Sequence, residues 1–197
     1  TGLPNGRALR RDLENPEIVN NPNLAIFSID LKNFKAVNDL KSHEMGDIAL
    51  KSVAQILALE LSALDQDDNE KDNIISDVAE KVRHKMRISD HVYRSSERGD
   101  EMIILADLTP RSAELKPKLT NEQRANKLRD NILATVDQYV HLTKLNEVNF
   151  SASIGFAVRT HNETPDNLLA LAEERMSQHK KAQTETLGAY REVGPKP

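Results

Sequence analysis

The stretch NLAIFSID, residues 23–30, is a run of apolar side chains that ends in the carboxylate of Asp30. A short apolar run of this kind, with β-branched and aromatic residues, is typical of a buried β-strand. Residues 46–61 follow with apolar side chains at helical spacing, which predicts an amphipathic helix. The sequence therefore predicts a buried strand that carries Asp30 at its carboxyl end, followed by a helix.

The segment SSERGDEM, residues 95–102, lies between two more strand-like runs, HVYRSS (91–96) and MIILAD (102–107). This arrangement predicts a β-hairpin with Gly-Asp-Glu at its turn. Asp100 and Glu101 are then neighbours, and like charges this close repel unless a cation or solvent relieves them. Because Gly-Asp-Glu is also an ordinary polar turn, the segment by itself fits either a metal site or a plain turn.

The end of the chain predicts two helices and one strand. Thr120 and Gln123 have the spacing of a capping box at the start of a helix, and Thr164 followed by a proline is typical of the start of another. Residues 148–158, VNFSASIGFAV, alternate like a strand, in which Gly155 would allow another backbone to approach closely.

The middle of the chain is less regular. Residues 65–73 predict a solvated loop, a second helix is expected from Ile74 toward Arg87, and residues 110–118 predict another loop. The resulting order, roughly α-β-α-α-β-β-α-β-α, predicts an α/β (α+β) domain with a central mixed β-sheet covered by helices.

Composition bounds the classes of function. The formal net charge of −4 over 197 residues argues against a nucleic-acid or membrane-surface binder that works by bulk electrostatics, so an anionic ligand needs local cations. The absence of cysteine excludes disulfides and thiolate zinc sites and fits a reducing cytoplasm. No apolar stretch approaches the ~18 residues of a membrane span, and the first residues, TGLPNGRALRR, lack a signal peptide's apolar core. The turn-like start suggests a fragment of a longer protein.

Five blocks occur in a characteristic order. They are TGLPNGRAL (1–9), IDLKNFKAVNDLKSHEMGDIAL (29–50), RISD (87–90) followed by RGDEM (98–102), SASIGFA (151–157) and AEERMSQHKK (172–181). Together they resemble the GGDEF domain, the diguanylate cyclase family. The resemblance covers residues 1–197 as one domain, apart from insertions near 59–85 and 110–118. It implies the palm-like fold of nucleotidyl cyclases.

The resemblance also implies an activity, the condensation of two GTP molecules into cyclic di-GMP with release of pyrophosphate. Each 3′-hydroxyl attacks the α-phosphate of the other GTP, so two domains, a homodimer, must meet face to face. The implied cofactor is Mg²⁺ (or Mn²⁺), a hard ion that takes a few carboxylate oxygens together with substrate phosphates. The implied location is cytoplasmic, with membrane attachment of a longer protein left open.

The resemblance assigns the metal to Asp30, the Leu31 carbonyl and Asp100, which we expect at exposed strand ends. It assigns metal binding and proton acceptance to Asp100, with Glu101 beside it as a second catalytic carboxylate. The alternative reading is that Asp30 caps a strand and Asp100 is a turn residue.

Asn38 and Asp47 resemble the pair that reads guanine in this family. A carboxylate accepts two hydrogens from the N1 and N2 edge of guanine, and an amide can both donate and accept. The alternative is that Asn38 lies in a turn and Asp47 is an acidic residue in the first turn of a helix, where the dipole favours it. His43 stands in the position near the ligand, but also fits an exposed loop.

Lys35 and Lys180 match lysines that contact phosphate, although each also fits a solvated surface lysine. The family usually has an arginine four residues after the second lysine, and this chain has Thr184. Arg98 replaces the first glycine of the signature. We expect its guanidinium to reach the triphosphate and to replace the charge that is missing at Thr184.

Arg87 and Asp90 match an inhibitory site that binds the product. The family usually leaves five residues between this aspartate and the signature, whereas residues 91–97 make seven here. The pair therefore fits either an inhibitory site or a plain surface ion pair.

Three functions remain after this reading. The first is an active diguanylate cyclase. The second is a degenerate domain that binds GTP or cyclic di-GMP as a regulatory module, favoured by Arg98, by Met102 in place of phenylalanine, by the two extra residues and by Thr184. The third is another palm-fold nucleotidyl cyclase, which the guanine-matched Asn38 and Asp47 disfavour.

Overall fold

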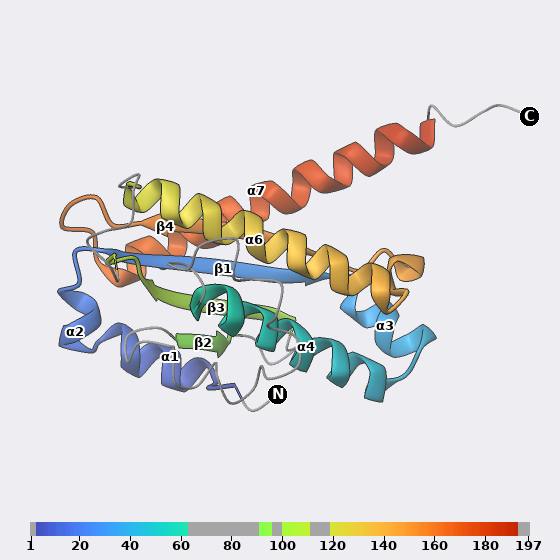
Figure 1. Cartoon of the computed structure of the whole chain (residues 1–197), viewed down its shortest axis with the longest axis horizontal. Helices are drawn as coiled ribbons and strands as arrows, with labels where there is room; N and C mark the ends of the chain where they lie inside the picture. Colours follow the sequence, from blue (N-terminus) through green and yellow to red (C-terminus); the bar gives the residue numbers. More distant parts are fainter. Residues whose placement is uncertain (1–2, 63–90, 96–99, 111–118, 193–197) are drawn as a thin grey trace, which may run out of the picture.

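The computed structural model describes residues 3–62, 91–95, 100–110 and 119–192, with side chains as far as residues 61 and 185 in the first and last of these ranges. Figure 1 shows the arrangement of its elements. In chain order they are α1 (Gly6–Leu13), α2 (Pro16–Val19), β1 (Leu24–Lys32), α3 (Phe34–Leu40), α4 (His43–Ser62), β2 (His91–Arg94), β3 (Glu101–Asp107), α6 (Asn121–Leu142), the 3₁₀ helix η2 (Leu145–Val148), β4 (Ser151–Val158) and α7 (Pro165–Glu192).

The four described strands form one sheet in the order β2-β3-β1-β4. The expected α/β class with a helix-covered sheet is confirmed. The expectation of a mixed sheet is wrong for the described strands, because all three strand pairings are antiparallel. The physical reason is that β1 lies in the centre and both of its neighbours run opposite to it, while β2 returns along β3. A parallel contact occurs only as an isolated bridge between Asn5 and Arg94 among the residues described.

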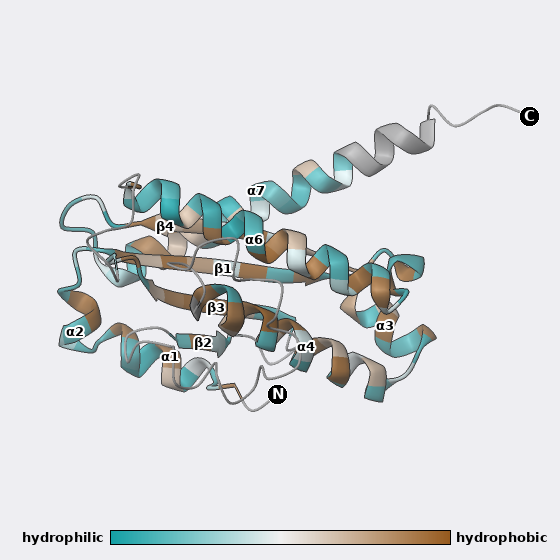
Figure 2. Ribbon diagram, in the orientation of Figure 1, coloured by the Kyte–Doolittle hydropathy of each residue, from teal (hydrophilic) through white to brown (hydrophobic). Residues whose placement is uncertain are grey.

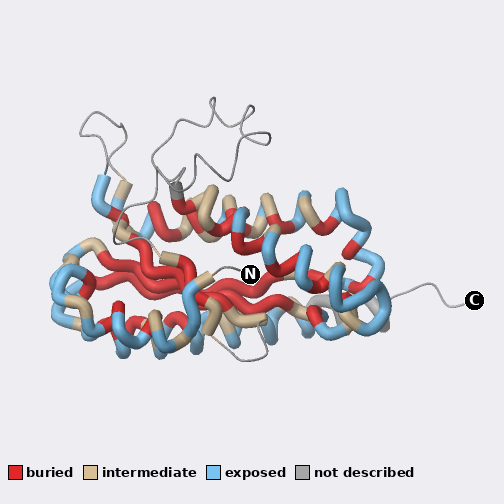
Figure 3. The backbone as a smooth tube through the Cα atoms, turned by 90° about the horizontal axis from the view of Figure 1, so that it is seen from below, coloured by how far each residue is buried: buried red, intermediate tan, exposed pale blue. Residues whose placement is uncertain are grey.

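The sheet separates two hydrophobic layers because successive side chains of a strand point to opposite faces. Ala25, Phe27, Ile29 and Leu31 of β1 pack with α3, α4 and α6, whereas Leu24 and Ile26 pack with α1, α2 and α7. Figure 3 shows the strands as a buried layer between helices. In Figure 2 the strands β1 and β3 are largely hydrophobic, and the covering helices alternate hydrophobic and hydrophilic residues.

The predicted helix starts are partly confirmed. Thr120 and Gln123 form the capping box of α6, and the Thr164 hydroxyl accepts a hydrogen bond from Asn167 N (3.3 Å) at the start of α7. The helix expected at residues 46–61 begins earlier, at His43. The reason is that the Ser42 hydroxyl accepts a hydrogen bond from Met45 N (3.0 Å) and so caps the helix three residues upstream. The predicted elements at 65–73 and 74–87, and the predicted loop at 110–118 apart from its first residue, lie outside the described residues.

The N-terminal segment holds the outer edge of β2. Pro4 O accepts a hydrogen bond from Arg94 N (2.9 Å), and the buried Tyr93 hydroxyl donates to Asp12 Oδ2 of α1 (2.7 Å). Hydrogen bonds from the Arg11 guanidinium and then the Tyr93 hydroxyl lower the pKa of Asp12 against the opposing effect of burial. The strand that precedes Asp100 and Glu101 is therefore fixed to the start of the chain.

Helix α7 lies directly on β4 at Gly155. A Cβ atom at this glycine would lie 2.0 Å from Met176 N and 2.3 Å from Ala172 O, both backbone atoms of α7. The expectation that Gly155 allows close approach of another backbone is confirmed.

The same helix also covers the outer edge of β4 with polar side chains spaced four residues apart. Arg175 Nη1 donates to Phe156 O (2.8 Å), His179 Nδ1 contacts Ile154 N (3.0 Å), and Gln183 Nε2 donates to Ala152 O (3.1 Å). Backbone groups of an edge strand need such partners when no further strand pairs with them. These contacts fix both the height and the rotation of α7 over the sheet.

We predict that Gly155→Ala destabilises the domain by about 3 kcal/mol, at the upper end of the usual cost of overpacking, because backbone atoms of α7 cannot rotate away from the added methyl group. Urea unfolding would measure this change. Ser151→Ala, at the half-buried start of the same strand, is the control and should change stability by less than ~0.5 kcal/mol. An unfolding midpoint that Gly155→Ala leaves in place would contradict the close packing of α7 on β4.

Candidate active site at the carboxyl end of strand β1

The carboxyl end of β1 lies beside the start of β3. Asp30 pairs in register with Glu101, and Leu31 N donates to Asp100 O (2.9 Å). The structure therefore brings together Asp30, Leu31 and Asp100, the three residues expected to bind metal, together with Glu101. Asp30 and Leu31 are separated from Asp100 and Glu101 by about seventy residues in the sequence, and the antiparallel pairing of β1 with β3 makes the two pairs neighbours.

The sequence predicted that Asp30 lies at an exposed strand end. This prediction is wrong, because Asp30 is buried with 5% of its surface accessible. Its side chain belongs to the face of the sheet that α7 covers, because it continues the even-numbered positions of β1. Lys180 Nζ of α7 lies 2.8 Å from Asp30 Oδ2. Within the described part of the chain, however, no donor is aligned with this buried oxygen for a hydrogen bond. The contact is thus an ion pair without hydrogen-bond geometry.

Other polar residues lie on the same face of the sheet. Ser153 pairs in register with Asp30 from the other side, and its hydroxyl donates to Gln183 Oε1 (2.9 Å). Burial, and then the charge of Glu101, raise the pKa of Glu173 on α7 above its ordinary value. The Glu173 carboxylate thus faces the same negative region as Glu101, where a cation would be stabilised.

Lys32 is a charged residue of this region that the sequence analysis missed. Its Nζ lies 3.3 Å from Thr184 Oγ1, and the Thr184 hydroxyl donates to Lys180 O (2.9 Å). Lys32 of β1 therefore places a positive charge beside Thr184, where the family usually has an arginine. The signal was available in the sequence, because Lys32 is two residues after Asp30 on the same strand and so shares its face.

Asn38 of α3 and Asp47 of α4 lie on adjacent helices. A Cβ on Gly46 would lie 1.8 Å from Asn38 Oδ1, so the Asn38 amide rests directly on the residue that precedes Asp47. Asp47 is exposed and is the fifth residue of α4, beyond the first turn in which a helix dipole favours an acidic residue. The first-turn explanation of Asp47 therefore does not apply.

The remaining predicted residues have simpler environments. Lys35 is exposed in the first turn of α3, and His43 is the exposed first residue of α4 and not part of a loop. Arg98 and the Arg87–Asp90 pair lie outside the described residues, so their roles stay predictions.

The comparison with protein families decides what kind of domain this is. A family model described as "Diguanylate cyclase, GGDEF domain" matches residues 1–67 and 68–186. The chain belongs to the GGDEF domain family.

Curated relatives of this GGDEF domain include diguanylate cyclase TpbB of Pseudomonas aeruginosa. It is 29% identical over 185 residues, which cover 89% of this chain and 33% of TpbB. The chain thus spans about a third of the length of this relative.

Solved GGDEF domains share the fold. The GGDEF domain of TpbB (YfiN) has a TM-score of 0.53 at 24% identity, with 92% of each chain covered. The GGDEF domain of DgcB from Caulobacter crescentus, solved in complex with c-di-GMP, has a TM-score of 0.57 at 18% identity over 92% of this chain and 88% of that chain. The expected palm-like cyclase fold is confirmed.

The donor set of this GGDEF domain can be tested against a magnesium ion. Among the described residues, no group of three or more His, Cys, Asp or Glu side chains is placed to enclose a metal. The set consists instead of the carboxylates of Asp30 and Asp100 and the Leu31 carbonyl, which fits an ion that completes its shell with water and phosphate oxygens. The buried Asp30 Oδ2, which lacks an aligned donor, is a suitable ligand atom.

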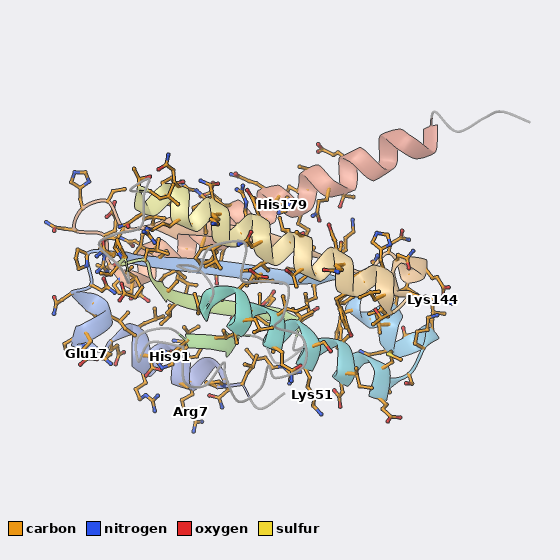
Figure 4. The ribbon with its side chains drawn as sticks, in the orientation of Figure 1. Arg7, Glu17, Lys51, His91, Lys144 and His179 are labelled. Carbon is orange, nitrogen blue, oxygen red and sulfur yellow. The ribbon has the colours of Figure 1, made fainter. Side chains whose placement is uncertain are left out.

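A pocket of about 490 Å³ lies elsewhere in this GGDEF domain, between α6, α7 and β4. Its lining includes Arg129, Arg175 and His179, the last of which is labelled on α7 in Figure 4, and none of the predicted site residues. The candidate site at the end of β1 is therefore distinct from this pocket. No described helix of this domain has both the length and the apolar character needed to cross a membrane.

We predict that Gly46→Ala weakens guanine-nucleotide binding about tenfold, ~1.4 kcal/mol, because the added methyl group displaces the Asn38 amide. Stability should stay unchanged or rise by up to ~1 kcal/mol, since alanine is the better helix former. Nucleotide titration and thermal unfolding would measure the two effects. Gln55→Ala, on the exposed face of the same helix, is the control. Unchanged binding in Gly46→Ala would separate Asn38 from nucleotide recognition.

Proposed function

We propose that this GGDEF domain is a diguanylate cyclase, which condenses two GTP molecules into cyclic di-GMP and releases pyrophosphate. The observation that carries the proposal is the convergence of Asp30, Leu31 and Asp100 at the end of β1, with Lys180 beside them. The likeness to TpbB and to a GGDEF domain bound to c-di-GMP supports the same assignment.

In this proposal Asp30, the Leu31 carbonyl and Asp100 hold Mg²⁺ or Mn²⁺. The metal, when bound, neutralises phosphate charge and lowers the pKa of the attacking 3′-hydroxyl. Asp100, with Glu101 beside it, accepts the proton of that hydroxyl. Lys35, Lys180 and Arg98 bind the triphosphate, and Lys32, from the same face as Asp30, adds a further cation.

Asp47 and Asn38 bind the guanine edge in this proposal, with His43 close to the nucleotide. The placement of Asp47 beyond the first turn of α4 supports this role, because helix-dipole stabilisation does not explain a carboxylate there. The Asn38 amide, which rests on Gly46, approaches the base from the neighbouring helix.

The proposal includes four further features for which the described residues give no direct observation. These are a homodimer for turnover, an inhibitory product site at Arg87 and Asp90, one GGDEF domain over residues 1–197 and a cytoplasmic location.

A second candidate is a regulatory module that binds GTP or cyclic di-GMP without turnover. The observation that favours it is the ion pair of Lys180 with Asp30, which neutralises a metal ligand within the chain itself. Incubation of the protein with GTP and Mg²⁺, followed by chromatography for cyclic di-GMP, distinguishes the two functions.

We predict that Asp30→Asn and Asp100→Asn each lower the rate of cyclic di-GMP formation at least ~100-fold, because each removes an anionic metal ligand and Asp100 also accepts a proton. The melting temperature should stay close to that of the unmodified protein, since half-exposed Lys180 can turn into solvent when its partner loses its charge. Asp137→Asn, on the exposed face of α6, is the control and should retain activity. Full turnover in either site variant would contradict the metal assignment.

We predict that Asp47→Ala weakens GTP binding by ~1–3 kcal/mol and leaves ATP binding unchanged, because only guanine donates hydrogens to this carboxylate. Titration with non-hydrolysable analogues of both nucleotides would measure the difference. Glu44→Ala removes an exposed carboxylate one turn earlier in α4 and serves as the control. Equal losses for the two nucleotides would show that Asp47 does not read the base.

A further inference from the structure

We propose that Lys180 is a resident counter-ion of Asp30 that a divalent metal ion must displace, and that this exchange couples metal binding to triphosphate binding. The inference rests on the proposed function in one respect, because it takes Asp30 as a metal ligand. It adds a role for Lys180 before nucleotide arrives, which the activity alone does not require.

The burial of the two side chains decides which of them moves. Only 7% of the Asp30 side chain is exposed, whereas 46% of the Lys180 side chain is exposed. Asp30 lies within β1 and is bounded by β3 and β4 on either side. Lys180 stands on the surface of α7 with a flexible four-carbon stem. The carboxylate is therefore fixed, and the ammonium group is the partner that can leave.

The need for a cation at Asp30 is strong. A buried carboxylate without a counter-charge is costly, and Glu101 and Glu173 add further negative charge on this face of the sheet. Among the described residues, Lys180 makes the ion pair with Asp30, while Lys32 is directed to Thr184. Lys180 thus stabilises the carboxylate as long as no metal is bound.

The geometry of the pair suits exchange. Lys180 Nζ lies 2.8 Å from Asp30 Oδ2, but this oxygen accepts no aligned hydrogen bond from the described part of the chain. A divalent ion coordinates carboxylate oxygens directly. The ion and the ammonium group compete for Oδ2, because two cations at that separation repel strongly. Metal binding therefore releases Lys180.

The ammonium group of Lys180, once released from Asp30, can bind the phosphate groups of a nucleotide. Lys32 Nζ already lies one turn along α7, at Thr184, so a triphosphate that reaches this face of the sheet would meet both lysines. A triphosphate bound to the metal attracts both. Because a coupling free energy acts in both directions, a bound triphosphate that attracts Lys180 must in turn strengthen metal binding at Asp30.

The first test measures Mn²⁺ affinity of the full chain without nucleotide, from the electron paramagnetic resonance signal of the free ion. Lys180→Met should bind Mn²⁺ about fivefold or more tightly than the unmodified protein, within the usual range of coupling between sites. Lys32→Met removes the same charge from the same face without breaking the Asp30 pair, and Lys181→Met removes it from the neighbouring exposed position of α7. Both controls should change the affinity less than twofold.

The second test repeats the titration with a non-hydrolysable GTP analogue. The factor by which the analogue strengthens Mn²⁺ binding should be smaller in Lys180→Met than in the unmodified protein. Lys180→Arg keeps a cation at Asp30 and covers the case in which Lys180→Met fails to fold; it should bind Mn²⁺ no more tightly than the unmodified protein. Lys180→Met should also melt at a lower temperature in chelator and recover with Mn²⁺, because its buried carboxylate lacks a cation.

Asp30→Asn separates this inference from the proposed function. If Asp30→Asn abolishes Mn²⁺ binding and Lys180→Met leaves it unchanged, the metal site stands and the exchange is overturned. If Asp30→Asn leaves Mn²⁺ binding unchanged, the metal assignment itself is wrong. Equal gains in Lys180→Met and Lys32→Met would also overturn the exchange, because they would show a general charge effect.

Discussion

The candidate site depends on the contact between α7 and the edge strand β4. Gly155 has no side chain, so the backbone of α7 lies against the strand at a distance that no other residue permits. Arg175 and Gln183 then fix the rotation of the helix by hydrogen bonds to the outward carbonyl groups of β4. This placement brings Lys180 over the end of β1, where its ammonium group meets Asp30. A helix seated one turn away would leave the buried carboxylate without its cation.

The second constraint acts on the other side of the sheet's central strand. The pairing of β1 with β3 places Asp100 and Glu101 beside Asp30, and β2 holds β3 from outside. The N-terminal segment in turn holds β2, through Pro4 and through the buried bond of Tyr93 to α1. Asp100 and Glu101 are thus held in place by β1 on one side and, through β2, by the N-terminal segment on the other.

The charges of the site follow from these two constraints. Negative charge lies on the face of the sheet that α7 covers, from Asp30, Glu101 and Glu173. The positive charges of Lys180 and Lys32 lie on the same face. The described carboxylates on this face outnumber the two lysines, so this edge attracts a cation more readily than an anion. Of these two cations, Lys180 makes the ion pair that stabilises the buried Asp30 carboxylate.

The sequence by itself determined the α/β class, the strand that carries Asp30 and the close approach at Gly155, because strand alternation and apolar runs are local patterns. The resemblance to the family named the candidate metal ligands, and their role stays a proposal. The sequence did not determine that the sheet is antiparallel, that α4 begins at His43, or that Asp30 is buried beneath Lys180. Only the tertiary structure decided these features. The physical reason is that an ion pair between residues 150 positions apart depends on how a helix is seated over a sheet, and that seating is the sum of many contacts which no local pattern contains.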